Sequence, residues 1–274
     1  MAQDFPVNFG FVTYHHQRRL DRALYHLDSL QAEVDAWLEE HPHRTWTMTE
    51  TDDDGPKNYV YCQVIRKPPS HLSVIIGDCL HNLRSALDNL AFELALAYTQ
   101  GPLAKKIEEA SAFPIQHVQT KKSKDRFESM TEGIHPKAKQ VIADVQPYIQ
   151  GEKFASHPLW QLNELSKRDK HRLPPVASLV NLRSVTFFVP EGIETDDVKQ
   201  LVTAFEERAA ILSYPAFDKT GAKVNIDFRP DFSVGFSHLV PKELLGRQIP
   251  ELLKLFHWYI NDKVLPSLKP YLEK

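Results

Sequence analysis

The segment that most constrains the fold is residues 75–97, which read IIGDCLHNLRSALDNLAFELALA. Its apolar side chains recur in alternating steps of four and three residues, the period of a helix that packs one face against a core. This apolar stripe consists of Ile76, Leu80, Leu83, Leu87, Leu90, Leu94 and Ala97. The periodicity therefore predicts a long helix with one face buried.

The opposite face of this predicted helix is polar, but its composition is unusual for a solvent-facing surface. Lys and Glu, the common residues of exposed helix surfaces, are scarce on it. At the helical angle per residue it covers an arc of roughly 160°. Its members are Asp78, His81, Asn82, Arg84, Ser85, Asp88, Asn89 and Phe92. Such a face has two interpretations: hydrogen bonds that tie the helix to its neighbours, or a functional site.

Composition excludes several classes of protein. The 274 residues have a net charge of −3 and therefore no overall basic character of the kind that marks many nucleic-acid-binding proteins. Cys62 and Cys79 form no CxxC pair, so a zinc knuckle is not expected. The first residues lack the features of a signal peptide, and no apolar run approaches 18 residues. We therefore expect a cytoplasmic protein that makes no membrane contact.

The familiar catalytic motifs are missing. The chain has no HExxH, no GxxxxGK[ST], no GxGxxG after a predicted strand and no GxSxG. These motifs mark zinc proteases, P-loop enzymes, dinucleotide-binding enzymes and serine hydrolases. No cofactor is therefore predicted.

Periodicity and turn residues predict the elements of the first part of the chain. Helices are expected at residues 14–40, 75–97, 135–149 and 158–172, and a strand at residues 59–66 after a turn at 52–56. Residues 101–133 are expected to be irregular, with Phe113-Pro114-Ile115 docked on the core. The basic run within them is expected to be a solvated loop. This run contains Lys121, Lys122, Lys124 and Arg126.

The second part of the chain is richer in strand-like sequence. Strands are expected at residues 184–189, 224–228 and 233–236, a turn at 229–231, and helices at 196–212 and 250–264. Helix-rich segments followed by antiparallel strands favour an α+β fold, here a helical bundle packed with a small, mainly antiparallel sheet. The strand at 59–66 is expected to join the later sheet. We therefore predict one unit, helix-rich over about 12–175 and strand-rich over about 180–240.

A second polar cluster ends the helix predicted at 158–172. Trp160, Glu164, Lys167 and His171 share one helical stripe, and the run Asp169-Lys170-His171-Arg172 precedes two prolines. Basic residues at a helix C-terminus stabilise the helix dipole, which gives the cluster a purely structural interpretation. The same groups also suit acid–base chemistry and phosphate binding.

The sequence from Arg84 to Asn89, RSALDN, resembles the Arg-x4-6-His signature helix of the HEPN superfamily. The resemblance covers about 25 residues directly, and Asn89 stands where the family has His. The chain also resembles bacterial proteins of about its size that share the LHNLRSALD and DKHR blocks. The HEPN resemblance implies a helical bundle and a metal-independent ribonuclease of a defence or toxin type system that acts as a homodimer. His81 or His171 would then replace the family's His.

Three functions follow as hypotheses. The first is RNA binding with metal-independent cleavage, in which Arg84 holds phosphate, Asp88 orients its partners, and His81 or His171 moves protons. Its further binding residues would be Asn82, Asn89, Asp169, Lys170 and Arg172. The second is a non-catalytic dimerisation or partner-binding module with a buried polar network.

The third is a metal-dependent hydrolase with His81, Asp88 and His171 as ligands. We expect no tightly bound transition metal, because Arg84, Lys167 and Lys170 are interleaved with those ligands and their charge opposes a cation. We also expect Arg84 or Asp88 within hydrogen-bonding reach of Asp169 or His171.

Overall fold

The computed structural model describes residues 14–100, 102–169, 176–181, 198–201, 204–224, 226, 230–236 and 240–273. The chain divides into two compact units, each assembled from several stretches of sequence. The first unit comprises residues 1–25, 79–163 and 256–274, and the second comprises residues 26–78 and 164–255. Neither unit therefore corresponds to a continuous half of the sequence.

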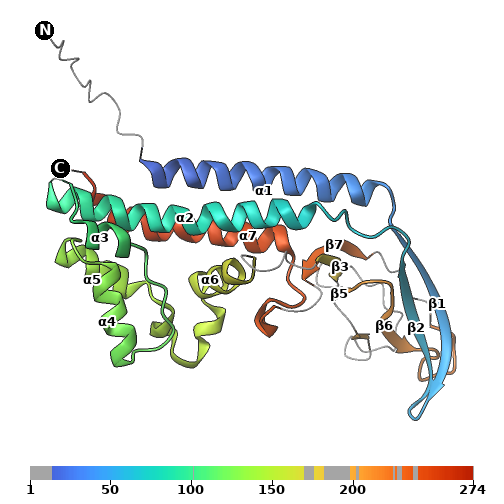
Figure 1. Cartoon of the computed structure of the whole chain (residues 1–274). Helices are drawn as coiled ribbons and strands as arrows, with labels where there is room; N and C mark the ends of the chain where they lie inside the picture. The colour runs from blue at the N-terminus through green and yellow to red at the C-terminus, as the bar shows by residue number, and fades with distance from the viewer. Residues whose placement is uncertain are drawn as a thin grey trace, which may run out of the picture. The chain divides into compact units, whose positions relative to one another are not determined.

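The long helices confirm the periodicity argument. α1 spans His15–Glu39 and α2 spans Leu72–Thr99, so α2 contains the whole of the predicted helix at 75–97 (Figure 1). The α2 residues Leu80, Leu83, Leu87 and Leu90 are completely buried, as the apolar stripe predicted. Within the described residues, no helix has the combination of length and apolar character that crossing a bilayer requires.

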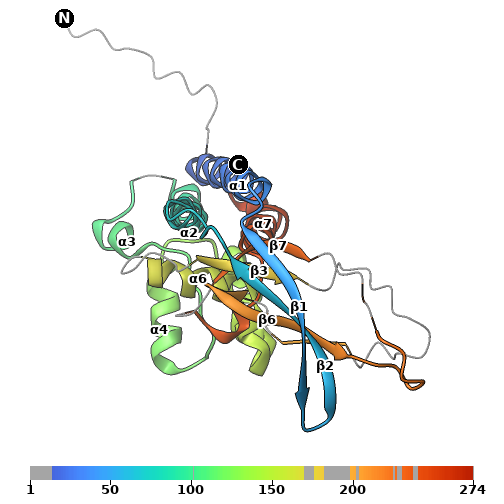
Figure 2. The ribbon, with the colours of Figure 1, turned by 90° about the vertical axis from the view of Figure 1, so that its right-hand side faces the viewer.

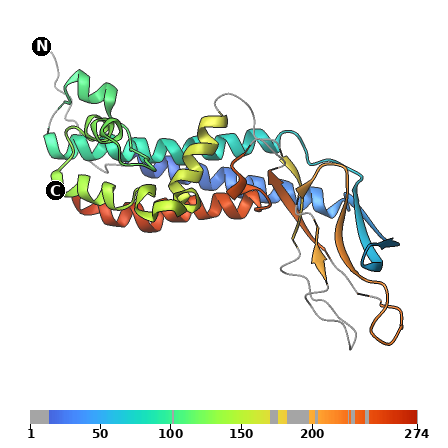
Figure 3. The ribbon, with the colours of Figure 1, turned by 90° about the horizontal axis from the view of Figure 1, so that it is seen from below.

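The first unit is built from helices among its described residues (Figure 3). Besides parts of α1 and α2, it contains α3 Lys105–Ala110, α4 Lys121–Met130, α5 Pro136–Asp144, the 3₁₀ segment Pro147–Ser156 and the first half of α6 Pro158–Asp169. The end of α7 Ile249–Trp258 continues through a π-helical turn, Tyr259–Val264, into α8 Leu265–Leu268. The helices predicted near 135, 158 and 250 are thus confirmed.

The expectation of irregular structure over residues 101–133 was wrong, because α3 and α4 lie there. α4 begins at a capping box in which the Thr120 side chain accepts a hydrogen bond from the backbone N–H of Ser123, and Ser123 reciprocates. These hydrogen bonds satisfy backbone N–H groups at the start of the helix. The sequence pattern alone did not reveal this helix start. Phe113, in the segment between the two helices, is completely buried, as predicted.

The sheets belong to the second unit, and all of their pairings are antiparallel. One sheet has the order β1-β2-β6-β4, with β1 His43–Asp52, β2 Gly55–Val64, β6 Arg208–Pro215 and β4 Lys199–Gln200. Figure 2 shows its strands β1, β2 and β6. The other has the order β5-β3-β7, with β5 Ala204–Phe205, β3 Val176–Asn181 and β7 Asp231–Phe236. Helices and antiparallel strands together confirm the α+β class.

The early strand joins the later sheet as predicted, because β2 pairs with β6. The helix expected at 196–212 was wrong, because β4, β5 and most of β6 occupy that stretch. In β6 the four consecutive residues 211–214 are buried. A strand covered on both faces loses the alternation of apolar and polar residues that identifies strands in a sequence.

The strand β7 contains the predicted strand at 233–236, and its partner is β3, which the sequence did not predict. Residues 184–189 lie outside the described residues, as do positions 225 and 227–229 of the predicted hairpin.

Candidate functional site

Arg84 and Asp88 together hold the backbone of Phe113 within the first unit. Arg84 Nη2 donates to the carbonyl oxygen of Phe113 at 2.8 Å and lies 2.9 Å from Asp88 Oδ1. The same Asp88 oxygen accepts the backbone N–H of Phe113 at 3.0 Å. One helical turn separates the two side chains on α2, so a single turn satisfies both polar backbone groups of a buried residue. The pair thereby anchors the segment between α3 and α4.

The Arg84 guanidinium is deeply embedded. Only 17% of the side chain is exposed, and Nη1 is buried without a hydrogen-bond partner in the described part of the chain. Burial lowers the pKa of Arg84, the Asp88 carboxylate opposes that shift, and the positive charge of Arg126 on α4 lowers the pKa further. Arg126 is therefore near enough to act electrostatically on Arg84, which the sequence did not indicate.

The other predicted residues of α2 have separate environments. His81 is exposed and lies 3.4 Å from Ser85 Oγ, one turn along the helix. Asn82 is buried, and its Oδ1 accepts a hydrogen bond from Arg19 Nη1 of α1 at 3.2 Å. Asn89 is half-buried and makes no side-chain hydrogen bond to any residue that the structure describes.

The C-terminal end of α6 is described only as far as Asp169. In the second unit, Asp169 lies against Gly77 of α2, where an added Cβ would come within 2.6 Å of Asp169 Oδ1. Lys170, His171 and Arg172 lie outside the described residues. The prediction of a site shared between Arg84 or Asp88 and this helix end therefore stays a prediction.

One polar cluster, at the start of α1, was not predicted from the sequence. Glu93 of α2 accepts the backbone N–H groups of His15, at 2.6 Å, and His16, at 3.3 Å, and its second oxygen contacts His16 Nδ1. A carboxylate at the first turn of a helix satisfies unpaired donors and offsets the helix dipole. Glu93 belongs to the predicted helix at 75–97, but its partner lies 77–78 residues away, so no local pattern revealed it.

The exposed surface of α4 is basic. Lys121, Lys122, Lys124 and Arg126 are all exposed, and none has an ion-pair partner among the residues described. By contrast, the two lysines of α3 each have a carboxylate partner, Lys105 with Glu109 and Lys106 with Glu132. The basic run of the sequence is thus an ordered helix whose four cations have no ion-pair partner among the described residues, and which also carries the exposed carboxylates Asp125 and Glu128.

The two units have charges of opposite sign. The residues of the first unit include 16 Lys and Arg against 13 Asp and Glu, a net +3, whereas those of the second include 17 against 23, a net −6. The overall charge of −3 therefore conceals a positive unit, and it is the unit that contains Arg84 and α4. Because the units interleave in the sequence, this division was not visible in the composition.

No group of three or more His, Cys, Asp and Glu side chains that could hold a metal ion occurs within the described ranges. Of the ligands that the metal hypothesis needs, Asp88 is bound to Arg84 and to the backbone N–H of Phe113, and His171 is not described. Comparison of the chain with protein-family models, with curated proteins and with solved structures found no match.

Proposed function

We propose that this protein binds RNA through the basic helix α4 of its first unit. The observation that carries this proposal is the excess of positive charge on α4, which has four exposed cations without an ion-pair partner in the described part of the chain against two exposed carboxylates. Phosphate contacts from Lys and Arg supply most of the sequence-independent affinity for nucleic acids. The net positive charge of the unit adds a longer-range attraction for a polyanion.

Within this surface, Arg126 is the best-placed phosphate ligand. It is exposed and unpaired among the described residues, whereas Arg84 is embedded and bound to Asp88 and Phe113. The buried Arg84 would then add positive charge behind the bound phosphate, since it lies near enough to Arg126 for that charge to lower the pKa of Arg84. A guanidinium also suits phosphate better than an ammonium does, because it donates two parallel hydrogen bonds.

A cavity beside α4 supports a single-stranded ligand. It has a volume of about 180 Å³. Its lining comprises Lys124, Phe127 and Glu128 of α4 together with Gln116, Gln119, Ala143 and Tyr148, and Glu128 is paired with Lys139. Single-stranded RNA is recognised through unstacked bases that lie on aromatic rings and form hydrogen bonds along their edges. The Gln119 amide and the Tyr148 ring provide both kinds of contact next to a lysine, whereas Gln116 Nε2 already donates to the Ser123 carbonyl oxygen.

Cleavage of the bound RNA is the further step that the HEPN resemblance implies. It requires a group that moves protons close to a bound phosphate. His81 is exposed one turn before Arg84 on α2, and its hydrogen bond among the described residues is the long one to Ser85. His81 is therefore the described histidine that we propose for this role, with His171 as the second candidate.

A non-catalytic module is the second candidate function, because one specific contact favours it. Arg84 and Asp88, the residues that carry the resemblance to a ribonuclease, bind the Phe113 backbone. In this alternative the signature helix stabilises the fold, and the exposed surface alone makes contact with partners.

RNA affinity should be measured by fluorescence anisotropy with a labelled 20-nucleotide single strand. We expect Arg126→Gln and Lys122→Gln each to weaken binding roughly 3- to 10-fold and to reduce the slope of log K against log salt by about 0.7 for each phosphate that the variant no longer neutralises. The matched control is Lys105→Gln, whose lysine is exposed but paired with Glu109. Equal effects of all three substitutions, or no binding at 100 mM salt, would contradict the proposal.

Cleavage is measured separately, on gels, in the presence of EDTA. Cleavage that persists in EDTA and is abolished in His81→Ala, with unchanged RNA affinity, supports the ribonuclease. Binding without cleavage in the wild type supports the non-catalytic module. Sedimentation equilibrium of the same samples tests the homodimer that the resemblance implies.

A further inference from the structure

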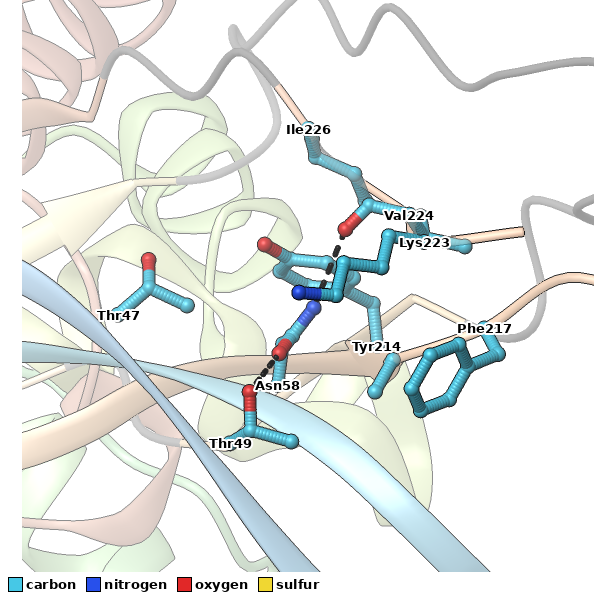
Figure 4. A pocket seen from close by; sticks show the side chains of 9 residues that line it. Thr47, Thr49, Asn58, Tyr214, Phe217, Lys223, Val224 and Ile226 are labelled. Carbon is cyan, nitrogen blue, oxygen red and sulfur yellow. Dashed lines mark hydrogen bonds between the residues drawn. The ribbon is translucent and has the colours of Figure 1, made fainter. Parts of the chain in front are cut away.

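The second unit contains a cavity of about 330 Å³ whose lining combines polar groups with one cation (Figure 4). It lies between the β1–β2 hairpin and the segment 214–226, so both sides come from the four-stranded sheet and its extension. Thr49 of β1, Asn58 of β2 and Tyr214 of β6 are successive cross-strand partners that line it side by side, and Thr47 and Lys223 also contribute to its lining. Its volume is at the lower end of the range of small-molecule sites.

The floor of the cavity is held by hydrogen bonds and presents a hydroxyl group that no described residue binds. Asn58 is buried, and its amide is fixed by a hydrogen bond from Thr49 Oγ1 at 2.8 Å and another to the Val224 carbonyl oxygen at 3.2 Å. Tyr214 is only 4% exposed, yet its hydroxyl makes no hydrogen bond with any described residue and opens into the cavity. A hydroxyl in such a position costs free energy unless water or a ligand binds it.

Lys223 supplies the charge. Figure 4 shows its side chain directed to the side of the cavity where Tyr214 and Asn58 lie. It is the one charged residue among those that line the cavity, and it has no carboxylate partner in the described ranges. Asp218 of the same turn is engaged elsewhere, because its carboxylate accepts the backbone N–H groups of Thr220 at 2.8 Å and Ala222 at 2.9 Å. The Lys223 ammonium group therefore favours a ligand with negative charge.

An aromatic ring at the edge of the cavity narrows the ligand class. Phe217 lines the cavity and is 42% exposed, so its ring is accessible to a ligand. It is paired with Lys223 in an antiparallel bridge, so the exposed ring and the ammonium belong to neighbouring backbone positions. A planar ring beside a cation matches a ligand that has a flat base at one end and a phosphate at the other.

We propose that this cavity binds a mononucleotide, with the phosphate on Lys223 and Tyr214 and the base against Phe217. The Thr47 hydroxyl provides a hydrogen-bonding partner for the ribose, and Thr49 Oγ1, whose hydrogen is donated to Asn58, remains an acceptor. The site lies in the second unit and does not depend on the RNA-binding surface of the first.

The proposal is tested by isothermal titration calorimetry of the full chain with UMP and AMP, with uridine, adenosine and inorganic phosphate as comparison probes. We expect at least one nucleotide to bind with a Kd below about 1 mM, and the matching nucleoside to bind on the order of 10-fold more weakly. Lys223→Met should weaken nucleotide binding by a similar factor. Tyr214→Phe should weaken it several-fold, because it removes only the hydroxyl and keeps the buried ring.

The matched control is Lys219→Met, which removes an exposed lysine of the same turn that does not line the cavity. Equal weakening by Lys219→Met and Lys223→Met would overturn the site, because it would show general attraction of anions. Inorganic phosphate binding as tightly as the nucleotides would overturn the contact with the base. No heat of binding for either nucleotide at millimolar concentration would overturn the whole proposal, provided that thermal unfolding shows the protein folded.

Discussion

Replacement of Asp88 tests the role of the Arg84–Asp88 pair of α2 most directly. Asp88→Ala removes the acceptor of the Phe113 N–H, at 3.0 Å, and the charged partner of Arg84, at 2.9 Å. Hydrogen bonds to charged groups contribute about 1.5–3 kcal/mol each, and removal of one partner from a buried pair costs about 3–5 kcal/mol. Asp88 is 37% exposed, so water partly replaces it. We therefore expect a loss near the lower end, about 2–3 kcal/mol.

The assay should report on the segment itself, since a protein with two units need not unfold in one step. Hydrogen exchange of the Phe113 amide, measured by NMR or on a short peptide by mass spectrometry, does so. A loss of 2–3 kcal/mol corresponds to exchange that is roughly 30- to 160-fold faster. Asp88→Asn keeps an acceptor oxygen and should show a smaller acceleration.

A double-mutant cycle separates the pair from its surroundings. Arg84→Met combined with Asp88→Ala should destabilise the segment by about 1–2 kcal/mol less than the sum of the single changes, because each single change leaves a charge without its partner. The surface control is Glu109→Ala, which breaks the exposed pair with Lys105 and should cost less than about 0.5 kcal/mol. If Asp88→Ala costs no more than this control, the network does not anchor Phe113 and the reasoning is refuted.

Three further predictions concern stability. Burial lowers the pKa of His157 to about 4, below its unfolded value of 6.5. As the pH falls from 6.5 to 4, only the unfolded chain therefore gains this proton, and the free energy of unfolding should decrease. His157→Asn retains an acceptor for the Leu159 N–H and should make the urea midpoint depend less on pH. Glu93→Ala should cost about 1–3 kcal/mol in urea unfolding, because it exposes the first N–H groups of α1, and a loss below 0.5 kcal/mol would contradict the capping role. Gly77→Ala should stabilise the protein by up to about 1 kcal/mol in an Asp169→Ala background, because alanine favours a helix. It should not do so in the wild type, where the new methyl group meets the Asp169 carboxylate. Equal effects in both backgrounds would show that the contact between residues 77 and 169 does not affect stability.

The sequence by itself determined the elements whose pattern is local. The steps of four and three in residues 75–97 specified α2 and its buried stripe, because a helix places such residues on one face whatever surrounds it. The same pattern exposed the unusual polar face with Arg84 and Asp88. The aromatic and β-branched run at 59–66 likewise specified β2, and the α+β class followed from the order of such segments.

Tertiary structure decided what those residues touch. Arg84 binds Phe113 at a separation of 29 residues, and Asn58 binds Val224 at a separation of 166, so no pattern within a short window contains either contact. β6 adopted a strand because β2 supplied its hydrogen bonds and both of its faces became buried, which overrode the helical appearance of its sequence. The positive charge of the first unit and the cavity at Lys223 likewise exist only once distant segments are brought together. Periodicity is a property of neighbouring residues, whereas a site is a property of packing.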